Sequence, residues 1–138
     1  MLPDFDSTDI YMTFKRRWTL LKHIGSPNDL KGFHYDLLLE DRDSCRSWRL
    51  AKIPELDGLV TEITSIPPHN LSWLETEGRS VSGDRGWASP IASGHFLGDL
   101  PILNESPCSV QLIGDPISGF LEIKENQCFL RSTDSFHL

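Results

Sequence analysis

The chain has 138 residues, of which 38% are hydrophobic and 24% charged, as is ordinary for one globular domain with its own core. Its formal net charge of −7 argues against broad, sequence-independent binding to nucleic acid, because that mode needs many cations to neutralise phosphates. The same charge is compatible with a small site that grips one strand end.

Targeting and redox signals predict a cytoplasmic protein. No apolar run approaches the length of a membrane span, so no membrane partner is expected. The acidic N-terminus lacks the basic-then-apolar order of a signal peptide. The three cysteines, Cys45, Cys108 and Cys128, form no close pair in the sequence, which indicates neither a disulfide framework nor a zinc knuckle.

The N-terminal part of the chain predicts a lead-in followed by the first strand of a single domain. Residues 1–13 are acidic and weakly patterned, which is typical of a lead-in, and the domain is expected over 14–138. Aromatic and apolar residues over 14–23 predict a strand that ends at His23. Residues 25–32 contain dense turn chemistry and predict a loop.

Residues 33–51 predict a β-hairpin with a polar turn near 41–44. With a period of two, the first strand places one set of apolar side chains on a core face: Tyr35, Leu37 and Leu39. The opposite face carries His34, Asp36, Leu38 and Glu40. An ordinary half-solvated strand shows the same alternation, so this pattern alone leaves a binding face and a plain surface face both open.

The second half of the chain predicts mainly short strands. Residues 59–66 are typical of a strand that Pro67-Pro68 stops, and 71–74 of one helical turn capped by Asn70 or, alternatively, an extended piece. Residues 78–95 are rich in glycine and serine. Three short strands follow at close spacing, over 110–113, 119–124 and 128–131. The predicted fold is therefore mostly β, a single small β-barrel with few short helices.

His23, His34 and Asp36 form a candidate metal-binding set. If the strand that ends at His23 lies beside the strand that begins at His34, two imidazoles and a carboxylate converge on one point. On a divalent cation such a set leaves coordination positions open for water and substrate. A separated histidine is more often structural than ligating, and that interpretation stays open beside the metal site.

Two blocks of sequence carry a resemblance to a known family. The first block runs from Lys22-His23 through His34-Tyr35-Asp36-Leu37-Leu38-Leu39-Glu40 to Ser47-Trp48, and the second from His69 to Gly78. They resemble the phosphoesterase domain of bacterial DNA ligase D. That family carries a lysine-histidine pair, a His-Tyr-Asp-Leu-Arg-Leu-Glu strand, a Ser-Trp in the return strand, and a His-Pro-Leu-x-Tyr-x-x-Phe-Glu-Gly block. The likeness covers roughly 18–132 and is weak beyond the second block.

The resemblance implies a small β-barrel and a metal-dependent hydrolase of DNA repair and end joining. Family members use manganese, with zinc as an alternative here, to remove a 3′-phosphate or a terminal ribonucleotide. By resemblance, His23, His34 and Asp36 would be the metal ligands. His69 would lie opposite them as the catalytic residue, contacting the phosphate or moving a proton. The implied partner is the 3′ end of a DNA or DNA/RNA strand, with ligase or polymerase activity on separate chains.

Three positions depart from the family's phosphate-contacting residues. Leu38 and Thr61 stand where arginines are expected, and Trp73 stands where a tyrosine is expected. Trp73 keeps an indole donor for substrate, and Arg79 or Arg85 would replace the missing arginines as substrate-binding residues. We therefore expect weak, metal-dependent activity, which an arginine restored at position 38 would raise if the site has room for it.

Two other functions stay open from the sequence. A binding module would keep the fold and the metal site and recognise a strand end or a protein partner without turnover, which the missing arginines and the acidic charge favour. A phosphoesterase acting on a small, non-nucleic substrate is the other, because an acidic chain is no handicap for such a substrate.

Overall fold

Alternating apolar and polar residues fold most of the chain into antiparallel strands. A computed structural model of the protein describes residues 16–27, 29–103 and 107–133. The expected lead-in at 1–13 lies outside the described residues. Within the described ranges, no helix has the length and apolar character needed to cross a membrane.

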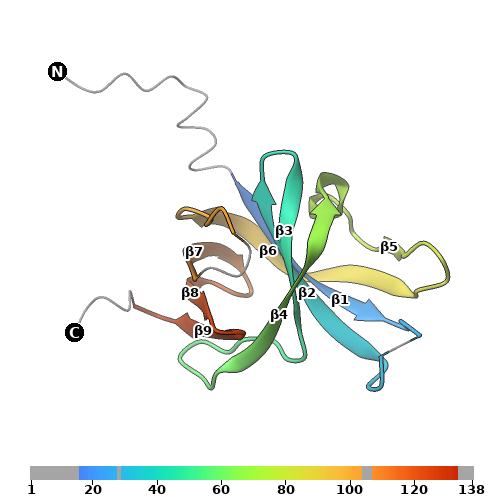
Figure 1. Cartoon of the computed structure of the whole chain (residues 1–138), viewed down its shortest axis with the longest axis horizontal. Helices are drawn as coiled ribbons and strands as arrows, with labels where there is room; N and C mark the ends of the chain where they lie inside the picture. The colour runs from blue at the N-terminus through green and yellow to red at the C-terminus, as the bar shows by residue number, and fades with distance from the viewer. Residues whose placement is uncertain (1–15, 28, 104–106, 134–138) are drawn as a thin grey trace.

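The first four strands follow one another as an antiparallel meander, blue to green in Figure 1. They are β1 (Arg17–Ile24), β2 (Phe33–Asp41), β3 (Ser44–Leu50) and β4 (Thr61–Asn70). The turn between β2 and β3 pairs Asp41 with Ser44 and so sets the register of that hairpin. Between β1 and β2, His23 lies directly opposite His34. The predicted hairpin and the predicted neighbouring of β1 and β2 are both confirmed.

The remaining elements close the sheet into a ring. They are the 3-10 turn η1 (Leu71–Leu74), β5 (Arg79–Ser80), β6 (Trp87–Leu97), β7 (Cys108–Asp115), β8 (Gly119–Lys124) and β9 (Gln127–Arg131). The order around the ring is β1-β2-β3-β4-β9-β8-β7-β6, and pairing of β6 with β1 closes it. The short β5 pairs with β6 alone. As predicted, the described chain is mostly β and forms one closed antiparallel barrel, with η1 as the single helical element of the described ranges.

One face of the barrel wall packs into a single interior core. Trp18 and Phe96 are the largest fully buried side chains of this core. The inward face predicted for β2 is confirmed, since three of its residues are buried there: Tyr35, Leu37 and Leu39. Gly114 makes room for the Trp18 ring, because a Cβ at position 114 would lie 2.8 Å from Trp18 Cζ2.

The opposite face of β1, β2 and β3 carries a second, smaller apolar cluster beneath η1. Its buried members are Leu21, Leu38 and Cys45. The apolar residues of η1 pack against them: Leu71, Trp73 and Leu74. Leu38 is 0% exposed, so position 38 belongs to this cluster and does not open into a site. An arginine at position 38 would therefore have no room, contrary to the condition set for restoring activity there.

The predicted turn at 71–74 is confirmed, and so is its cap. Asn70 precedes η1 in an extended conformation, and its side chain accepts a hydrogen bond from Ser72 N at 3.0 Å. The extended alternative for this segment is wrong.

Pro67 and Pro68 do not end their strand, contrary to the prediction. β4 continues through them to Asn70. The pairing of β3 with β4 shifts at this point, so that Ser47 pairs with Ile66 and Cys45 with His69, and neither proline has a paired residue. A proline has no amide hydrogen to donate to a neighbouring strand. Because the two prolines lie where the pairing is interrupted, no such hydrogen bond is needed from them.

The glycine- and serine-rich segment 78–95 gives little strand signal, yet β5 and most of β6 lie there. β6 runs between β1 and β7, and its small residues allow close strand contact. At Gly94, a Cβ would lie 2.0 Å from the carbonyl oxygen of Ile113. This segment is a strand because both of its edges pair with neighbouring strands, and its composition alone does not reveal that pairing.

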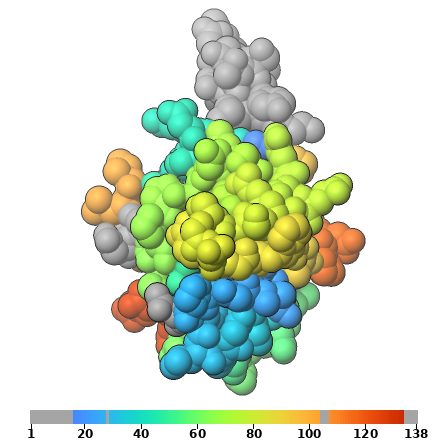
Figure 2. All heavy atoms as spheres, turned by 90° about the vertical axis from the view of Figure 1, so that its right-hand side faces the viewer, coloured from blue at the N-terminus to red at the C-terminus, as the bar shows by residue number. Residues whose placement is uncertain are grey.

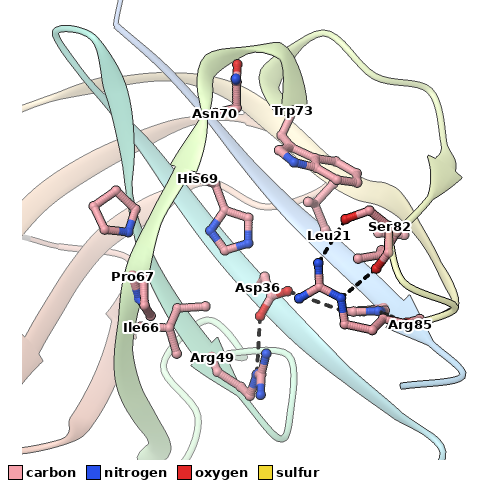
Figure 3. Close-up of a pocket in the computed structure, with 14 residues that line it drawn as sticks. Leu21, Asp36, Arg49, Ile66, Pro67, His69, Asn70, Trp73, Ser82 and Arg85 are labelled. Carbon is pink, nitrogen blue, oxygen red and sulfur yellow. Dashed lines mark hydrogen bonds and ion pairs between the residues drawn. The ribbon is translucent and has the colours of Figure 1, made fainter. Parts of the chain in front are cut away.

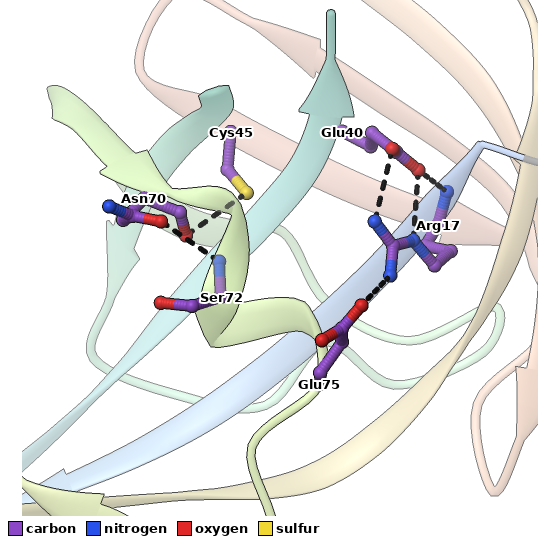
Figure 4. Close-up of polar contacts among 6 residues, drawn as sticks. All are labelled: Arg17, Glu40, Cys45, Asn70, Ser72 and Glu75. Carbon is purple, nitrogen blue, oxygen red and sulfur yellow. Dashed lines mark hydrogen bonds and ion pairs between the residues drawn. The ribbon is translucent and has the colours of Figure 1, made fainter. Parts of the chain in front are cut away.

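An ion-pair network fastens the end of η1 to the barrel, as Figure 4 shows. Arg17 donates from its backbone N and from Nε to Glu40 Oε1, at 2.9 and 3.1 Å, and from Nη2 to Glu40 Oε2 at 3.1 Å. Its Nη1 donates to Glu75 Oε1 at 3.1 Å. Glu40 is therefore bound to Arg17 through both of its carboxylate oxygens.

The Glu40 contact predicts a pH-dependent contribution to stability. Burial alone would raise the pKa of Glu40, but the hydrogen bonds from Arg17 outweigh it and the pKa is lowered. A carboxyl group whose pKa is lower in the folded state stabilises the fold above its unfolded pKa, about 4.3, and loses this effect as the pH falls through the folded value. Because Arg17 is a third exposed, we expect Glu40→Gln to lose only about 1 kcal/mol at pH 7.

Urea unfolding at pH 7 and at pH 3 measures this difference. The gap between wild type and Glu40→Gln should shrink at pH 3, while Glu62→Gln, at an exposed position of β4, should match wild type at both values. An equal loss at both pH values would show that the carboxylate charge of Glu40 is not the cause.

Candidate metal centre

Two neighbouring strands bring His23, His34 and Asp36 together on one face of the wall. His23, the last but one residue of β1, lies opposite His34 on β2, and Asp36 follows two residues later on the same face. One ligand atom from each residue lies within 4.8 Å of the others. The three side chains are buried, with relative exposures of 7%, 6% and 3%. The convergence expected from the sequence is confirmed.

Each histidine is oriented by a hydrogen bond from its other ring nitrogen. His23 Nε2 donates to the carbonyl oxygen of Arg85 at 2.5 Å, and His34 Nδ1 donates to Asp29 Oδ2 at 2.8 Å. Both acceptors fix the tautomer, so in the neutral rings His23 Nδ1 and His34 Nε2 carry the free lone pairs. These two nitrogens lie 3.8 and 3.4 Å from Asp36 Oδ2.

Two buried atoms of this set have no hydrogen-bond partner among the described residues. They are His34 Nε2 and Asp36 Oδ1. A buried polar atom without a hydrogen-bond partner is costly, and a bound cation would satisfy His34 Nε2. Asp36 Oδ2 faces the same point, whereas Oδ1 faces Arg49 Nε at 3.6 Å. Two imidazole nitrogens and one carboxylate suit a divalent transition metal such as manganese or zinc. The residues present therefore fit a metal ion.

The two ionisable ligands shift each other's protonation. Burial would raise the pKa of Asp36, but contact with His34 and the charge of Arg49 outweigh it and lower the pKa. Burial would lower the pKa of His34, but its contacts with Asp36 and Asp29 outweigh it and raise the pKa. The carboxylate is thus ionised and ready to bind a cation at neutral pH.

The loop from Val81 to Gly86 reaches the site because glycine occupies position 86. A Cβ at Gly86 would lie 1.9 Å from the carbonyl oxygen of Ile24, at the end of β1. The φ of +93° at Gly86 also favours glycine. In Figure 2 this yellow segment lies between the green residues of β4 and η1 and the blue residues of β1. The close approach puts the Arg85 carbonyl beside His23.

A pocket of about 490 Å³ opens beside the metal-binding set. His23 and Asp36 line it, whereas His34 does not. His69, from the far end of β4, lines the same pocket, as Figure 3 shows. Residues from β1, β2, β3, β4, η1 and the loop before β6 thus share one opening.

His69 is held in one orientation by Ser47. The Ser47 hydroxyl donates to the carbonyl oxygen of Cys45 at 2.9 Å, so it accepts from His69 Nδ1 at 2.9 Å. The other ring nitrogen, Nε2, then carries the lone pair. Burial lowers the pKa of His69, although the Asp36 carboxylate acts in the opposite direction. His69 is therefore an imidazole that is mostly neutral at pH 7.

The three substrate-binding residues predicted from the sequence lie close to the pocket, in different settings. Arg85 and Trp73 line it, and Arg85 donates from Nε and Nη2 to Ser82 at 2.6 and 3.0 Å. Arg79 is not part of the lining. It lies over the Trp73 ring, 3.5 Å from the centroid, and donates to Ser72 Oγ at 3.1 Å. Both of these arginines are thus held by other residues.

Sequence reasoning missed Arg49, which also lines the pocket. The register of the hairpin could have placed Arg49 at the site. Once the turn pairs Asp41 with Ser44, counting back along both strands puts Asp36 opposite Arg49. Asp29, which orients His34, had no comparable signal, because its position depends on the shape of the loop between β1 and β2.

Compared with known protein families and with curated proteins, the chain matches none. The likeness to the DNA ligase D phosphoesterase domain stays a prediction that depends on the two sequence blocks. The metal-binding set, the pocket and His69 are described by their geometry independently of that likeness.

The geometry of this site predicts binding of one divalent cation. In calorimetric titration with Mn²⁺, His34→Ala and Asp36→Ala should lose most of the affinity of the wild type, because each removes one of three ligands. Asp29→Asn should weaken binding by about ten- to a hundredfold, since it removes the carboxylate that orients His34.

His95→Ala is the matched control, because His95 is exposed on β6 and lies outside the set. Unchanged Mn²⁺ affinity in both His34→Ala and Asp36→Ala would rule out the site.

Proposed function

We propose that this protein is a metal-dependent phosphoesterase that acts on the 3′ ends of DNA, removing a 3′-phosphate or a terminal ribonucleotide. The observation that carries the proposal is one pocket lined by two members of a metal-binding set, by a third histidine and by arginines. Buried ligand atoms without a hydrogen-bond partner, beside a pocket, support a role in binding a ligand over a purely structural one.

The residues divide between holding a cation and moving a proton. His23, His34 and Asp36 would hold a divalent cation, which neutralises phosphate charge and makes a water more acidic when bound. His69 is the titratable group across the pocket. Its Nε2 can take a proton from water or give one to a leaving oxygen, while Ser47 keeps the ring in place.

The substrate class in this proposal comes from the sequence blocks, and the pocket's arginines are compatible with it. A single end group needs few cations, so the net charge of −7 is no obstacle. Ligase or polymerase partners would be separate chains.

The decisive assay is release of phosphate from a 3′-phosphate-terminated DNA primer, with and without Mn²⁺. We expect slow release that depends on the metal, and a fall of about a hundred- to ten-thousandfold in His69→Gln, the range for loss of a general acid or base. His95→Gln serves as the control. A protein that binds Mn²⁺ but releases no phosphate from the primer would contradict the proposal, and release from p-nitrophenyl phosphate alone would favour a small substrate.

A binding module is the second candidate, and the burial of Leu38 favours it. The resemblance places a phosphate-contacting arginine at position 38, and here that position is 0% exposed within the cluster beneath η1. Such a module would recognise a 3′ end or a protein partner without turning it over.

Leu38→Arg tests whether position 38 belongs to the core. The substitution would bury a charge among Leu21, Cys45 and η1, so we expect a loss of about 3 kcal/mol or more in the free energy of unfolding. We expect no gain of activity. Leu59→Arg, at a position that is 90% exposed, should leave stability nearly unchanged. A stable, more active Leu38→Arg protein would show that the site does accept an arginine there.

A further inference from the structure

Arg49 lines the pocket with its side chain half exposed. It stands on β3 directly opposite Asp36, and its side chain is 50% exposed. Its Nε forms an ion pair with Asp36 Oδ1 at 3.6 Å, a distance longer than a hydrogen bond. Within the described ranges its guanidinium makes no hydrogen bond, so the terminal nitrogens are available to a ligand.

The neighbouring arginines are bound elsewhere. Arg79 covers the Trp73 ring outside the pocket lining. Arg85 is tied to Ser82 through two of its three nitrogens, which holds it at the pocket wall with limited freedom. Of the two arginines that line the pocket, Arg49 is therefore the one whose guanidinium makes no hydrogen bond to another described residue.

The charges around the pocket suit a compact anion. Among its described lining residues, Asp36 is the single carboxylate, and Arg49 and Arg85 supply two guanidinium groups. A cation held beside them would add to the positive charge. A phosphoryl group presents several oxygens at once, and a guanidinium fork can donate two parallel hydrogen bonds to two of them.

We propose that Arg49 is the residue that binds the phosphoryl group of the substrate. The inference deepens the proposed function and rests on it for the nature of the ligand. Leu38 faces the apolar cluster, whereas Arg49, on the adjacent strand, faces the pocket beside Asp36. The phosphate-binding charge thus comes from β3 and not from β2.

A purely structural pair between Arg49 and Asp36 would behave differently. It would affect the stability of the fold or the affinity for the cation, and the affinity for phosphate would stay the same. Phosphate affinity, measured while the cation is present, therefore separates the two roles.

The test is calorimetric titration of inorganic phosphate into the full chain in the presence of Mn²⁺. In Arg49→Gln we expect phosphate affinity to fall by about ten- to a hundredfold, the loss typical for a charge-assisted donor. Arg49→Lys keeps the charge without the fork and should bind with intermediate affinity. Arg42→Gln removes the same charge from an exposed position in the turn of the same hairpin and is the matched control. Mn²⁺ affinity and thermal melting are measured on each variant.

Equal phosphate affinity in wild type and Arg49→Gln overturns the inference, and so does a wild type that does not bind phosphate. A loss in Arg42→Gln as large as in Arg49→Gln also overturns it, because the effect would then be one of general charge. Failure of the proposed function has a different signature. If the wild type binds phosphate through Arg49 but releases none from the 3′-phosphate primer, the role of Arg49 stands. The proposed hydrolytic activity is then wrong.

Discussion

The register between β1 and β2 is the constraint on which the candidate site depends. Because His23 lies opposite His34, both imidazoles leave the wall on one face, and Asp36 follows on that face two residues later. A slip of β2 by one residue would turn His34 and Asp36 into the barrel. The inward-facing residues of β2 oppose such a slip: Tyr35, Leu37 and Leu39. The apolar face that builds the core therefore also holds the metal-binding set in place.

The outer face of the same wall is divided between a polar and an apolar region. The metal-binding set lies under the loop that ends at Gly86, and the cluster around Leu38 lies under η1. Asp36 and Leu38 are two positions apart on β2, so the boundary between site and core runs along a single strand. An arginine on β2 beyond Asp36 would enter the apolar region, whereas Arg49 on β3 remains beside the pocket.

Several features that position the site could not be predicted from local sequence. The pairing shift that carries β4 past Pro67 to His69 depends on β3, its neighbour in the sheet. β6 begins within the glycine- and serine-rich segment 78–95 and is a strand because β1 and β7 pair with its edges. The carbonyl of Arg85 reaches His23 because Gly86 permits close approach of two backbones. Each of these depends on contacts between segments far apart in the chain.

The sequence by itself determined the mostly β fold, the hairpin of β2 and β3, the capped turn at η1 and the three residues that could hold a metal ion. These features follow from periodicity, turn chemistry and residue type, which act over a few neighbouring positions. Only the tertiary structure decided that Leu38 is buried, that Glu40 binds Arg17, and that Arg49 lines the pocket beside Asp36. Alternation assigns a side chain to a face of a strand. What covers that face is decided by other segments packing against it, and here η1 covers Leu38 while Arg49 is left half exposed.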